Sequence, residues 1–206
     1  MIVTDTIIPG VFIIEPRVFE DARGYFFESF SQRDFDDNIS KKVFSACADG
    51  HNNPQYPDNN GSIVFVQDNE SRSKYGVLRG LHFQKPPYAQ SKLVRCVIGK
   101  VLDVAVDIRV GSPTYGRYVS VELSAENHKS LFLPRGMAHG FAVLSDDVLF
   151  QYKCDRFYSP QSEGAIAWND KDLNIDWMLP SSKVILSDKD SCHPYLNGFE
   201  SPFKFK

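Results

Sequence analysis

The stretch LVRCVIGKVLDVAVDIR, residues 93–109, carries the strongest structural signal in the sequence. Two alternating runs rich in β-branched residues flank Gly99-Lys100. Glycine at the first turn position suits a two-residue type II′ turn. The pattern therefore predicts a β-hairpin in which the numbers of paired residues sum to 199.

Alternation divides this predicted hairpin into two faces. One face is largely apolar and typical of a core: Leu93, Arg95, Val97, Leu102, Val104, Val106 and Ile108. The other mixes apolar residues with charges of both signs: Lys92, Val94, Cys96, Ile98, Val101, Asp103, Ala105, Asp107 and Arg109. The second face fits either a solvated surface or the wall of a polar cavity.

Outward from this stretch, short alternating segments with turn residues between them predict an all-β sandwich or barrel. The expected strands cover residues 10–14, 64–66, 77–83, 118–123, 131–133, 140–144 and 148–154, with the last two facing each other across Ser145 to Asp147. Helix is scarce. Residues 31–39 predict a short capped helix with Phe35 and Ile39 facing inward.

The length of 206 residues predicts one domain over residues 1–190 with a C-terminal tail over residues 191–206. The tract at 45–62, rich in Gly, Pro, Asn and Asp, has no periodicity and is expected to be a loop insertion that is either functional or a surface feature.

Composition excludes several classes of protein. A net charge of −3 argues against non-specific nucleic-acid binding, which needs a basic face. No run of apolar residues is long enough to span a membrane, and the start MIVTDTIIPG lacks the features of a signal peptide. The four cysteines form no CxxC pair. We therefore expect a reduced, cytoplasmic protein without structural disulfides.

Two histidines beside glycines are candidates for chemistry: His82 in RGLHFQ and His139 in PRGMAHGF. Histidine titrates near neutrality and is a natural general base. The segment before His139 resembles the second motif of cupin barrels. In metal-binding cupins the first motif is His-x-His followed by Glu, whereas Gln84 stands here in place of the second ligand and no Glu follows. We therefore predict a cupin-like barrel without a metal or other cofactor.

A series of strings extends this resemblance over nearly the whole chain, from about residue 9 to 190. They are DARG, FFES, FVQDN, VLRGLHFQ, KLVRC, VLDVAVDIR, SPTYG, VELSAEN, PRGMAHGF, FQYK, YSPQSEG and LSDKD. In this order they resemble the dTDP-4-dehydrorhamnose 3,5-epimerase family. The resemblance implies a cupin-like jelly-roll β-barrel with a few short helices, working in dTDP-rhamnose and polysaccharide biosynthesis. It also implies a homodimer, with exchange of N-terminal strands as one arrangement.

The resemblance implies a role for each matching residue. His82 is similar to the family's base, Asp190 to its carboxylate partner, Tyr152 to the acid, and Lys92 to the group that stabilises the enolate oxygen. The positions that match substrate contacts are Arg23, Glu28, Gln67, Asn69, Arg79, His139, Glu163 and Lys189. The implied reaction inverts carbons 3 and 5 of dTDP-4-dehydro-6-deoxy-D-glucose to give dTDP-4-dehydro-L-rhamnose.

This reaction is coherent from first principles. The C–H bonds at carbons 3 and 5 are acidic because each flanks the ketone. The resulting enolate needs a cation or donor at its oxygen, and inversion needs a base and an acid on opposite sides of the ring.

Spacing adds three local predictions. Lys92 should have Asp107 opposite and Asp103 nearby. Arg79 and His82 share a pocket only if Gly80 lies in a bulge. The short connection at 144–147 should place Tyr152 across from His139.

Three alternatives remain open at this point. A mono-epimerase or a ketoisomerase would share the fold and the base, and would differ in the acid. A non-catalytic sugar-nucleotide-binding cupin would not need His82 and Tyr152 as base and acid. A metal-dependent cupin oxygenase would need a further carboxylate or histidine ligand.

Overall fold

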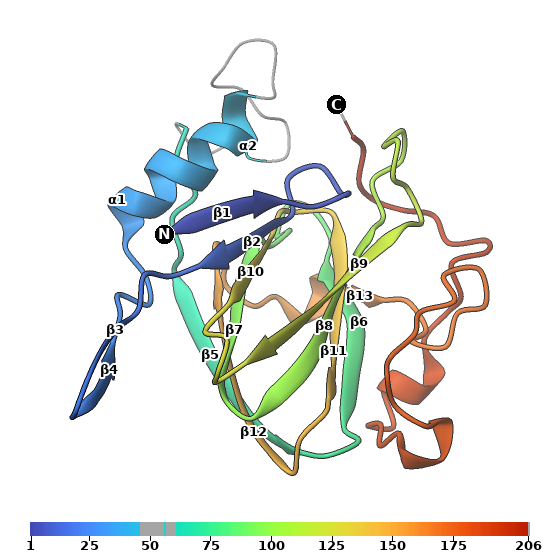
Figure 1. Cartoon of the computed structure of the whole chain (residues 1–206). Coiled ribbons are helices and arrows are strands. Elements are labelled where there is room, and N and C mark those ends of the chain that lie inside the picture. Colours follow the sequence, from blue (N-terminus) through green and yellow to red (C-terminus); the bar gives the residue numbers. More distant parts are fainter. Residues whose placement is uncertain (46–55, 57–60, 206) are drawn as a thin grey trace.

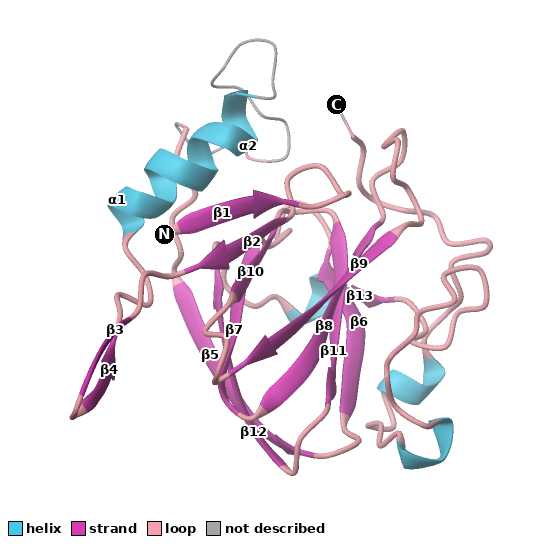
Figure 2. Ribbon diagram, viewed as in Figure 1, coloured by secondary structure: helices cyan, strands magenta, loops and turns pink. Residues whose placement is uncertain are grey.

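The computed structural model describes residues 1–45, 56 and 61–205, so the predicted insertion at 45–62 lies largely outside the described residues. Two antiparallel sheets face each other around a shared core, and the C-terminal segment runs along one side (Figures 1 and 2). The described strands form two facing sheets and not one continuous hydrogen-bonded cylinder. The predicted all-β, cupin-like jelly-roll architecture with a few short helices is confirmed.

The six-stranded sheet contains, in spatial order, β1 (Ile2–Asp5), β2 (Phe12–Glu15), β10 (Ser130–Leu133), β7 (Lys92–Ile98), β12 (Asp147–Cys154) and β5 (Gln67–Lys74). The five-stranded sheet contains β13 (Glu163–Ala165), β6 (Leu78–Gln84), β11 (Met137–Val143), β8 (Lys100–Asp107) and β9 (Tyr118–Ser124). A separate hairpin of β3 (Phe19–Asp21) and β4 (Gly24–Phe26) projects from the side of the molecule (Figure 1).

Short helices complete the chain. They are α1 (Gln32–Phe35), a π-helical turn (Asp36–Ser40), α2 (Lys41–Ser45), and 3₁₀ turns at Pro160–Ser162, Ser181–Lys183 and Asp190–Cys192. The predicted helix near residue 31 is confirmed, because the Ser31 side chain caps α1 by accepting from the backbone N–H of Asp34. Phe35 and Ile39 are buried, as predicted.

The predicted hairpin at 93–109 is wrong in its pairing. β7 bonds to β10 and β12 in one sheet, whereas β8 bonds to β11 and β9 in the other. Gly99 carries the chain between the sheets with φ +76, and a Cβ there would lie 2.1 Å from the carbonyl oxygen of Asp147. Alternation specifies which side of a strand faces inward, but it does not specify the neighbouring strand.

The segments at 140–144 and 148–154 show the same error, because β11 and β12 also lie in opposite sheets. They are not hairpin partners, yet alternate residues of both strands point into the space between the sheets. Phe141 from β11 and Phe150 from β12 stack there with ring centroids 4.3 Å apart.

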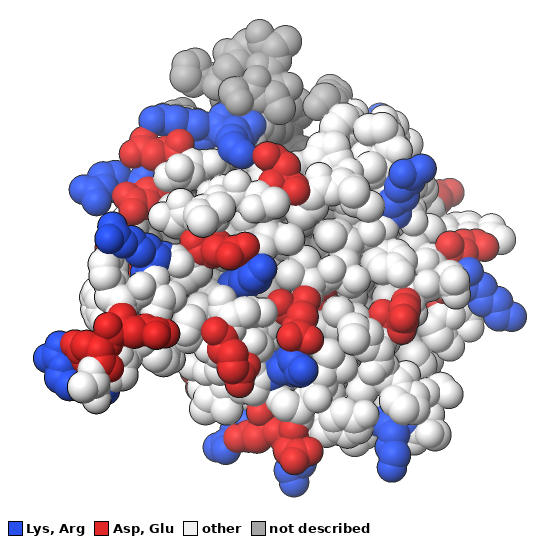
Figure 3. All heavy atoms as spheres, in the orientation of Figure 1, with Lys and Arg blue, Asp and Glu red and all other residues white. Residues whose placement is uncertain are grey.

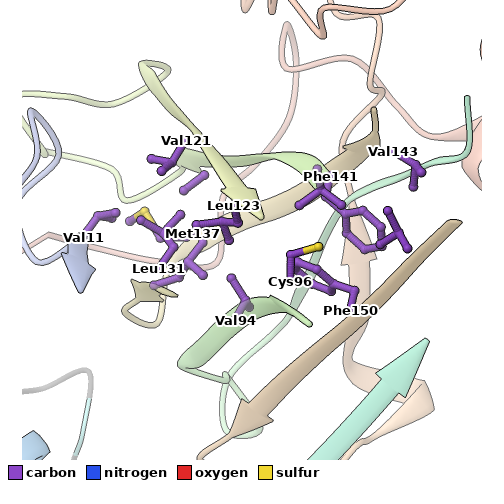
Figure 4. Close-up of a cluster of buried hydrophobic side chains, with 14 of the residues drawn as sticks. Val11, Val94, Cys96, Val121, Leu123, Leu131, Met137, Phe141, Val143 and Phe150 are labelled. Carbon is purple, nitrogen blue, oxygen red and sulfur yellow. The ribbon is translucent and has the colours of Figure 1, made fainter. Parts of the chain in front are cut away.

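The mixed face of residues 92–109 lines the interior. Val94, Cys96, Val101 and Ala105 join the apolar cluster between the sheets, which Figure 4 shows in close-up. Burying one side chain of the size of Val or Phe stabilises a fold by about 1.5–3 kcal/mol. The solvated surface is therefore excluded, and this face packs in the core between the sheets, with Lys92 at its end lining a cavity.

The opposite face of β8 is also buried. Leu102, Val104, Val106 and Ile108 pack outside the two-sheet core, against the C-terminal part of the chain. That second cluster includes Leu173, Trp177 and Phe203. The five-stranded sheet is therefore covered on both faces, and the chain after β13 is held against it.

The predicted bulge at Gly80 is confirmed. His139 of β11 pairs with His82, and Phe141 pairs with Arg79, so β6 contains one extra residue between the two pairs. Gly80 has φ +132, a conformation that residues with a Cβ rarely adopt. Because of the bulge, Arg79 and His82 lie on the same face of β6, opposite Leu78, Leu81 and Phe83 of the outer cluster.

One strand was placed wrongly from the sequence. Residues 64–66 are not a strand, and β5 begins at Gln67 with the polar sequence QDNESRSK. β5 is the edge of the six-stranded sheet, where one side of the ladder pairs with β12 and most side chains are exposed or half-buried. Polar edge strands lack the apolar alternation on which the prediction depends.

The surface is charged and mixed. Figure 3 shows basic and acidic side chains interspersed over one face of the molecule. Among the described residues, no helix is long and apolar enough to cross a membrane.

Candidate active site

His82 and Asp190 form an imidazole–carboxylate pair. His82 lies on β6, and Asp190 lies on the 3₁₀ turn that packs beneath that strand. The His82 Nε2 atom is 2.6 Å from Asp190 Oδ1, and the Ser187 hydroxyl donates to Asp190 Oδ2 at 2.7 Å. Burial favours the protonated carboxyl, but hydrogen bonds from His82 and Ser187 outweigh it and lower the pKa of Asp190 to about 2.

Asp190 is therefore ionised at neutral pH and accepts a hydrogen from His82 Nε2. That bond leaves Nδ1 as the ring atom with a free lone pair. The His82 side chain is 30% exposed, whereas that of Asp190 is 6% exposed. The pair therefore offers an oriented base whose carboxylate partner is shielded from solvent.

Tyr152 and Lys92 come from the opposite sheet. Tyr152 on β12 pairs with Val94 of β7 and Asn69 of β5. The Lys92 ammonium nitrogen lies 5.9 Å from the centre of the Tyr152 ring. Burial raises the pKa of Tyr152 above its ordinary value, so its hydroxyl keeps its proton at neutral pH.

Burial has the opposite effect on Lys92. It lowers the pKa of this side chain, and the nearby carboxylates of Asp103 and Glu163 partly offset the shift by favouring the ammonium form. The predicted position of Asp107 opposite Lys92 is wrong, because Lys92 pairs with Leu133 and Cys154. Asp107 is instead held by Arg109, at 2.8 Å, and by the hydroxyls of Ser112 and Thr114.

A cavity of about 110 Å³ joins the two walls. Six of the predicted site residues line it together: Gln67, Asn69, His82, Lys92, Tyr152 and Glu163. Five more lining residues are not among the predicted site residues: Phe83, Gln84, Gln90, Cys154 and Tyr158. The cavity therefore gathers the predicted base, acid and cation from two different sheets.

Further predicted residues surround this cavity. Arg79 is exposed, donates to the Ser73 hydroxyl at 3.3 Å, and lies close enough to Tyr152 for its charge to counter the burial effect on the tyrosine pKa. Lys189 forms an ion pair with Glu163 at the rim. The Arg79 guanidinium is therefore exposed to an anionic ligand, whereas the Lys189 ammonium is paired with Glu163.

His139 is more deeply placed. It is the strand neighbour of His82, it is buried, and its Nε2 atom lies 2.9 Å from Asp103 Oδ2. The prediction that Tyr152 lies across from His139 holds only in the sense that the two residues come from facing sheets. Phe150, the inward neighbour of Tyr152, has its ring centre 6.5 Å from that of His139.

Two predicted substrate contacts lie elsewhere in the chain. Arg23 is in the turn of the projecting β3–β4 hairpin, where it forms an exposed ion pair with Asp21. Glu28 lines a separate hollow of about 380 Å³ beside that hairpin and α1. Neither residue lines the cavity that contains His82.

Gln84 has a structural role at the position where a metal-binding cupin has its second ligand. Its side chain donates to the Tyr88 carbonyl at 2.7 Å and accepts from the Ser159 N–H at 2.7 Å, which joins two loops at the rim. Tyr158 is placed by similar contacts, with its N–H donating to Gln67 and its hydroxyl to Glu163. Cys154 lies two residues after Tyr152 on one strand, so alternation would have predicted it.

Sequence reasoning also missed His193. Its Nε2 atom lies 3.4 Å from Asp190 Oδ1, and its ring meets the His82 ring edge-on at 5.6 Å. The first cupin motif of this sequence offers no third metal ligand beside His82 and His139. The fold instead brings Asp190 and His193 to His82, which no short motif could have indicated.

An oriented imidazole on one wall, with a protonated tyrosine and a half-buried lysine on the other, defines an enzyme site built for proton transfer. The sequence profile of the family described as dTDP-4-dehydrorhamnose 3,5-epimerase matches residues 5–198. The dTDP-4-dehydrorhamnose 3,5-epimerase of Shigella flexneri is 52% identical over 190 residues, which cover 92% of this chain and 93% of that relative. The chain belongs to the dTDP-4-dehydrorhamnose 3,5-epimerase family.

Solved structures agree with this assignment. The crystal structure of dTDP-6-deoxy-D-glucose-3,5-epimerase from Legionella pneumophila Philadelphia 1, in complex with dTDP-4-keto-L-rhamnose, is 41% identical with a TM-score of 0.84, covering 99% of this chain and 98% of that one. A 3'-monoepimerase from Streptomyces bikiniensis in complex with dTDP-quinovose is 33% identical with a TM-score of 0.77, covering 93% and 86%.

Proposed function

We propose that this chain is a dTDP-4-dehydrorhamnose 3,5-epimerase that converts dTDP-4-dehydro-6-deoxy-D-glucose to dTDP-4-dehydro-L-rhamnose. The observation that carries the proposal is the placement of His82 and Tyr152 on opposite walls of one cavity. Inversion at carbon requires removal of a proton from one side of the ring and delivery of a proton to the other.

His82 acts as the base. With its Nε2–H donated to Asp190, the Nδ1 lone pair takes the proton from carbon 3 or carbon 5. The imidazole becomes positively charged, and the ionised Asp190 stabilises that charge. Asp190 therefore orients the ring and also favours proton transfer to it.

Lys92 and Tyr152 act from the other wall. The electron pair released from the C–H bond moves to the ketone oxygen, and the Lys92 ammonium stabilises the resulting enolate. Tyr152 then donates its hydroxyl proton to the opposite side of the ring. No change of oxidation state occurs, so the mechanism requires neither a redox cofactor nor a metal.

The nucleotide diphosphate is held at the rim by cations. Arg79 and Lys189 lie beside the cavity of this chain, and arginine binds phosphate with a planar pair of donors. Gln67, Asn69, His139 and Glu163 contribute polar contacts to the substrate. The buried cysteines Cys96 and Cys154 are free thiols, which is consistent with action in the reducing cytoplasm.

The enzyme acts as a homodimer whose partner completes the site. Arg23 and Glu28 sit on or beside a hairpin that projects from the molecule, and Phe26 of that hairpin is 71% exposed. A second copy of the chain would cover this apolar surface and receive the hairpin residues at its own cavity. Mixing inactive Arg23→Ala and His82→Asn proteins should restore activity if the residues act across the dimer, whereas no recovery would place them within one chain.

A mono-epimerase is the alternative, because a 3'-monoepimerase is among the structural relatives. The test is proton NMR of purified protein with dTDP-4-dehydro-6-deoxy-D-glucose, with Tyr152→Phe as a matched variant. The proposal predicts a product inverted at both carbons. Inversion at one carbon would establish the alternative, and no conversion would leave a binding protein or another substrate.

A further inference from the structure

In the part of the chain that the structure describes, one group of three side chains has the donors and spacing of a metal site: His82, Asp190 and His193. One ligand atom from each lies within 4.8 Å of the others. The group joins β6 to the 3₁₀ turn at Asp190–Cys192, after which His193 follows directly. Asp190 and His193 are therefore one helical turn apart and point toward the same histidine.

The donor set suits zinc. Two imidazole nitrogens and one carboxylate oxygen are the three protein ligands of many zinc sites that keep one position open. Zinc–nitrogen bonds of about 2.0 Å place neighbouring ligand atoms of a tetrahedral site about 3.3 Å apart. Asp190 Oδ1 and His193 Nε2 are already 3.4 Å apart. The 2.6 Å contact between His82 and Asp190 must lengthen, and the ligand atoms of His82 and His193 lie within 4.8 Å of each other.

The surroundings also favour a cation. Asp190 is buried, and His193 has only 12% of its side chain exposed. The Lys189 ammonium, which precedes Asp190, forms its ion pair with Glu163. His82 remains 30% exposed toward the cavity, which leaves a path for the ion to enter.

We propose that His82, Asp190 and His193 form a zinc-binding site that inhibits the enzyme when it is occupied. Zinc would take the lone pair of His82 Nε2, and the hydrogen from that atom would move to Nδ1. The neutral imidazole then has no lone pair at the atom that faces the substrate, so it cannot accept a proton. Nothing is oxidised or reduced, and removal of zinc reverses the change.

Zinc binding does not depend on the proposed function, whereas its inhibitory effect does. Titration calorimetry with zinc chloride tests binding on its own, using the whole protein at neutral pH. We expect one zinc ion per chain. His193→Ala and His193→Gln should weaken binding at least tenfold, because loss of an outer-shell partner alone typically costs about 10–100-fold in affinity.

The exposed thiol of Cys192 lies next to His193 and provides the matched control. Cys192→Ser should bind zinc as the wild type does. Circular dichroism of each variant checks that it is folded. Equal zinc affinity in wild type and both His193 variants would overturn the proposal, as would loss of binding in Cys192→Ser alone.

Inhibition is then measured as the ratio of epimerisation rates with and without zinc, within each variant. Wild type should lose activity on addition of zinc and regain it with a chelator, and His193→Gln should need at least tenfold more zinc. Full activity of the zinc-loaded wild type would overturn the inhibitory role. If chelated protein shows no epimerisation, the proposed function fails, and calorimetry still decides whether the zinc site exists.

Discussion

The two sheets supply opposite kinds of chemistry to one cavity. The five-stranded sheet provides His82, whose partner Asp190 has a pKa lowered to about 2 and is therefore negatively charged. The six-stranded sheet provides Tyr152 and Lys92, where burial raises the tyrosine pKa and lowers the lysine pKa. In the proposed mechanism, the first wall stabilises an incoming proton, and the second holds a proton ready for delivery.

This difference has a structural cause. The Asp190 carboxylate accepts hydrogen bonds from His82 and Ser187, which favour its ionised form. Tyr152 lies beside the buried thiol of Cys154, whose own pKa burial raises to about 11. The proposed base His82 is therefore hydrogen-bonded to a carboxylate that stays charged, whereas the proposed acid Tyr152 lies in a desolvated environment that keeps its hydroxyl protonated.

The largest effect should follow loss of the base. His82→Asn removes the proton acceptor, so epimerisation at both carbons should fall by about 10²–10⁴-fold, the usual contribution of general acid–base catalysis. Product formation by NMR measures it. Lys171→Ala provides a control, because Lys171 is exposed and does not line the cavity. Similar losses in both variants would contradict the assignment of His82.

Loss of the acid should have the next largest effect. Tyr152→Phe keeps the ring and its packing near Phe150 and removes only the hydroxyl, so inverted product should form at least about 10²-fold more slowly. The assay is the same NMR measurement. A rate equal to that of the wild type would show that another group delivers the proton.

A substitution at Gly80 tests whether the bulge in β6 positions His82. A Cβ at this residue would lie 2.5 Å from the Gly140 Cα, and φ is +132. We therefore expect Gly80→Ala to lower the free energy of unfolding by at least about 1–3 kcal/mol and to reduce activity. Denaturant titration measures the stability. Gly198→Ala, in open space at φ +82, should cost conformational strain without this clash. Equal losses of stability and activity in the two variants would contradict the positioning role.

The pH profile should show the smallest effect. Lys92 has its pKa lowered by burial from the ordinary 10.5, so its ammonium is present below that lowered pKa and is lost as the pH rises through it. Catalysis should then fall about tenfold per pH unit on the alkaline side. The raised pKa of Tyr152 places its own deprotonation above pH 10.

Lys92→Arg checks the assignment of this alkaline limb, because a guanidinium stays charged throughout this range. The limb should move to higher pH in the variant, with circular dichroism used to verify folding. An unchanged limb would assign it to another group.

Side-chain orientation could be predicted from the sequence far better than strand pairing. Alternation over residues 92–109 separated the two faces of these strands, and the spacing of Arg79 and His82 around Gly80 predicted a bulge. The pairing of β7 with β8 was wrong, because a glycine turn between two strands is also compatible with a crossing between sheets. β5 was missed because a polar edge strand has no apolar period.

The site divides in the same way. The family resemblance brought together six residues that the fold places in one cavity. His193 was missed because its neighbour Asp190 contacts His82 through tertiary packing alone. Arg23 and Glu28 match substrate-contacting positions of the family but lie away from that cavity. Residue identity alone does not specify where the fold places a residue relative to the cavity.

The most direct test of the two-wall account is deuterium exchange at carbons 3 and 5 in deuterium oxide, resolved by carbon and by configuration. The account predicts that Tyr152→Phe still exchanges these hydrogens with retention of configuration, because His82 removes and returns them on one side. His82→Asn should lose exchange altogether. Two results would contradict the assignment of base and acid to opposite sheets. One is that Tyr152→Phe loses both hydrogen exchange and inversion, and the other is that His82→Asn still exchanges these hydrogens.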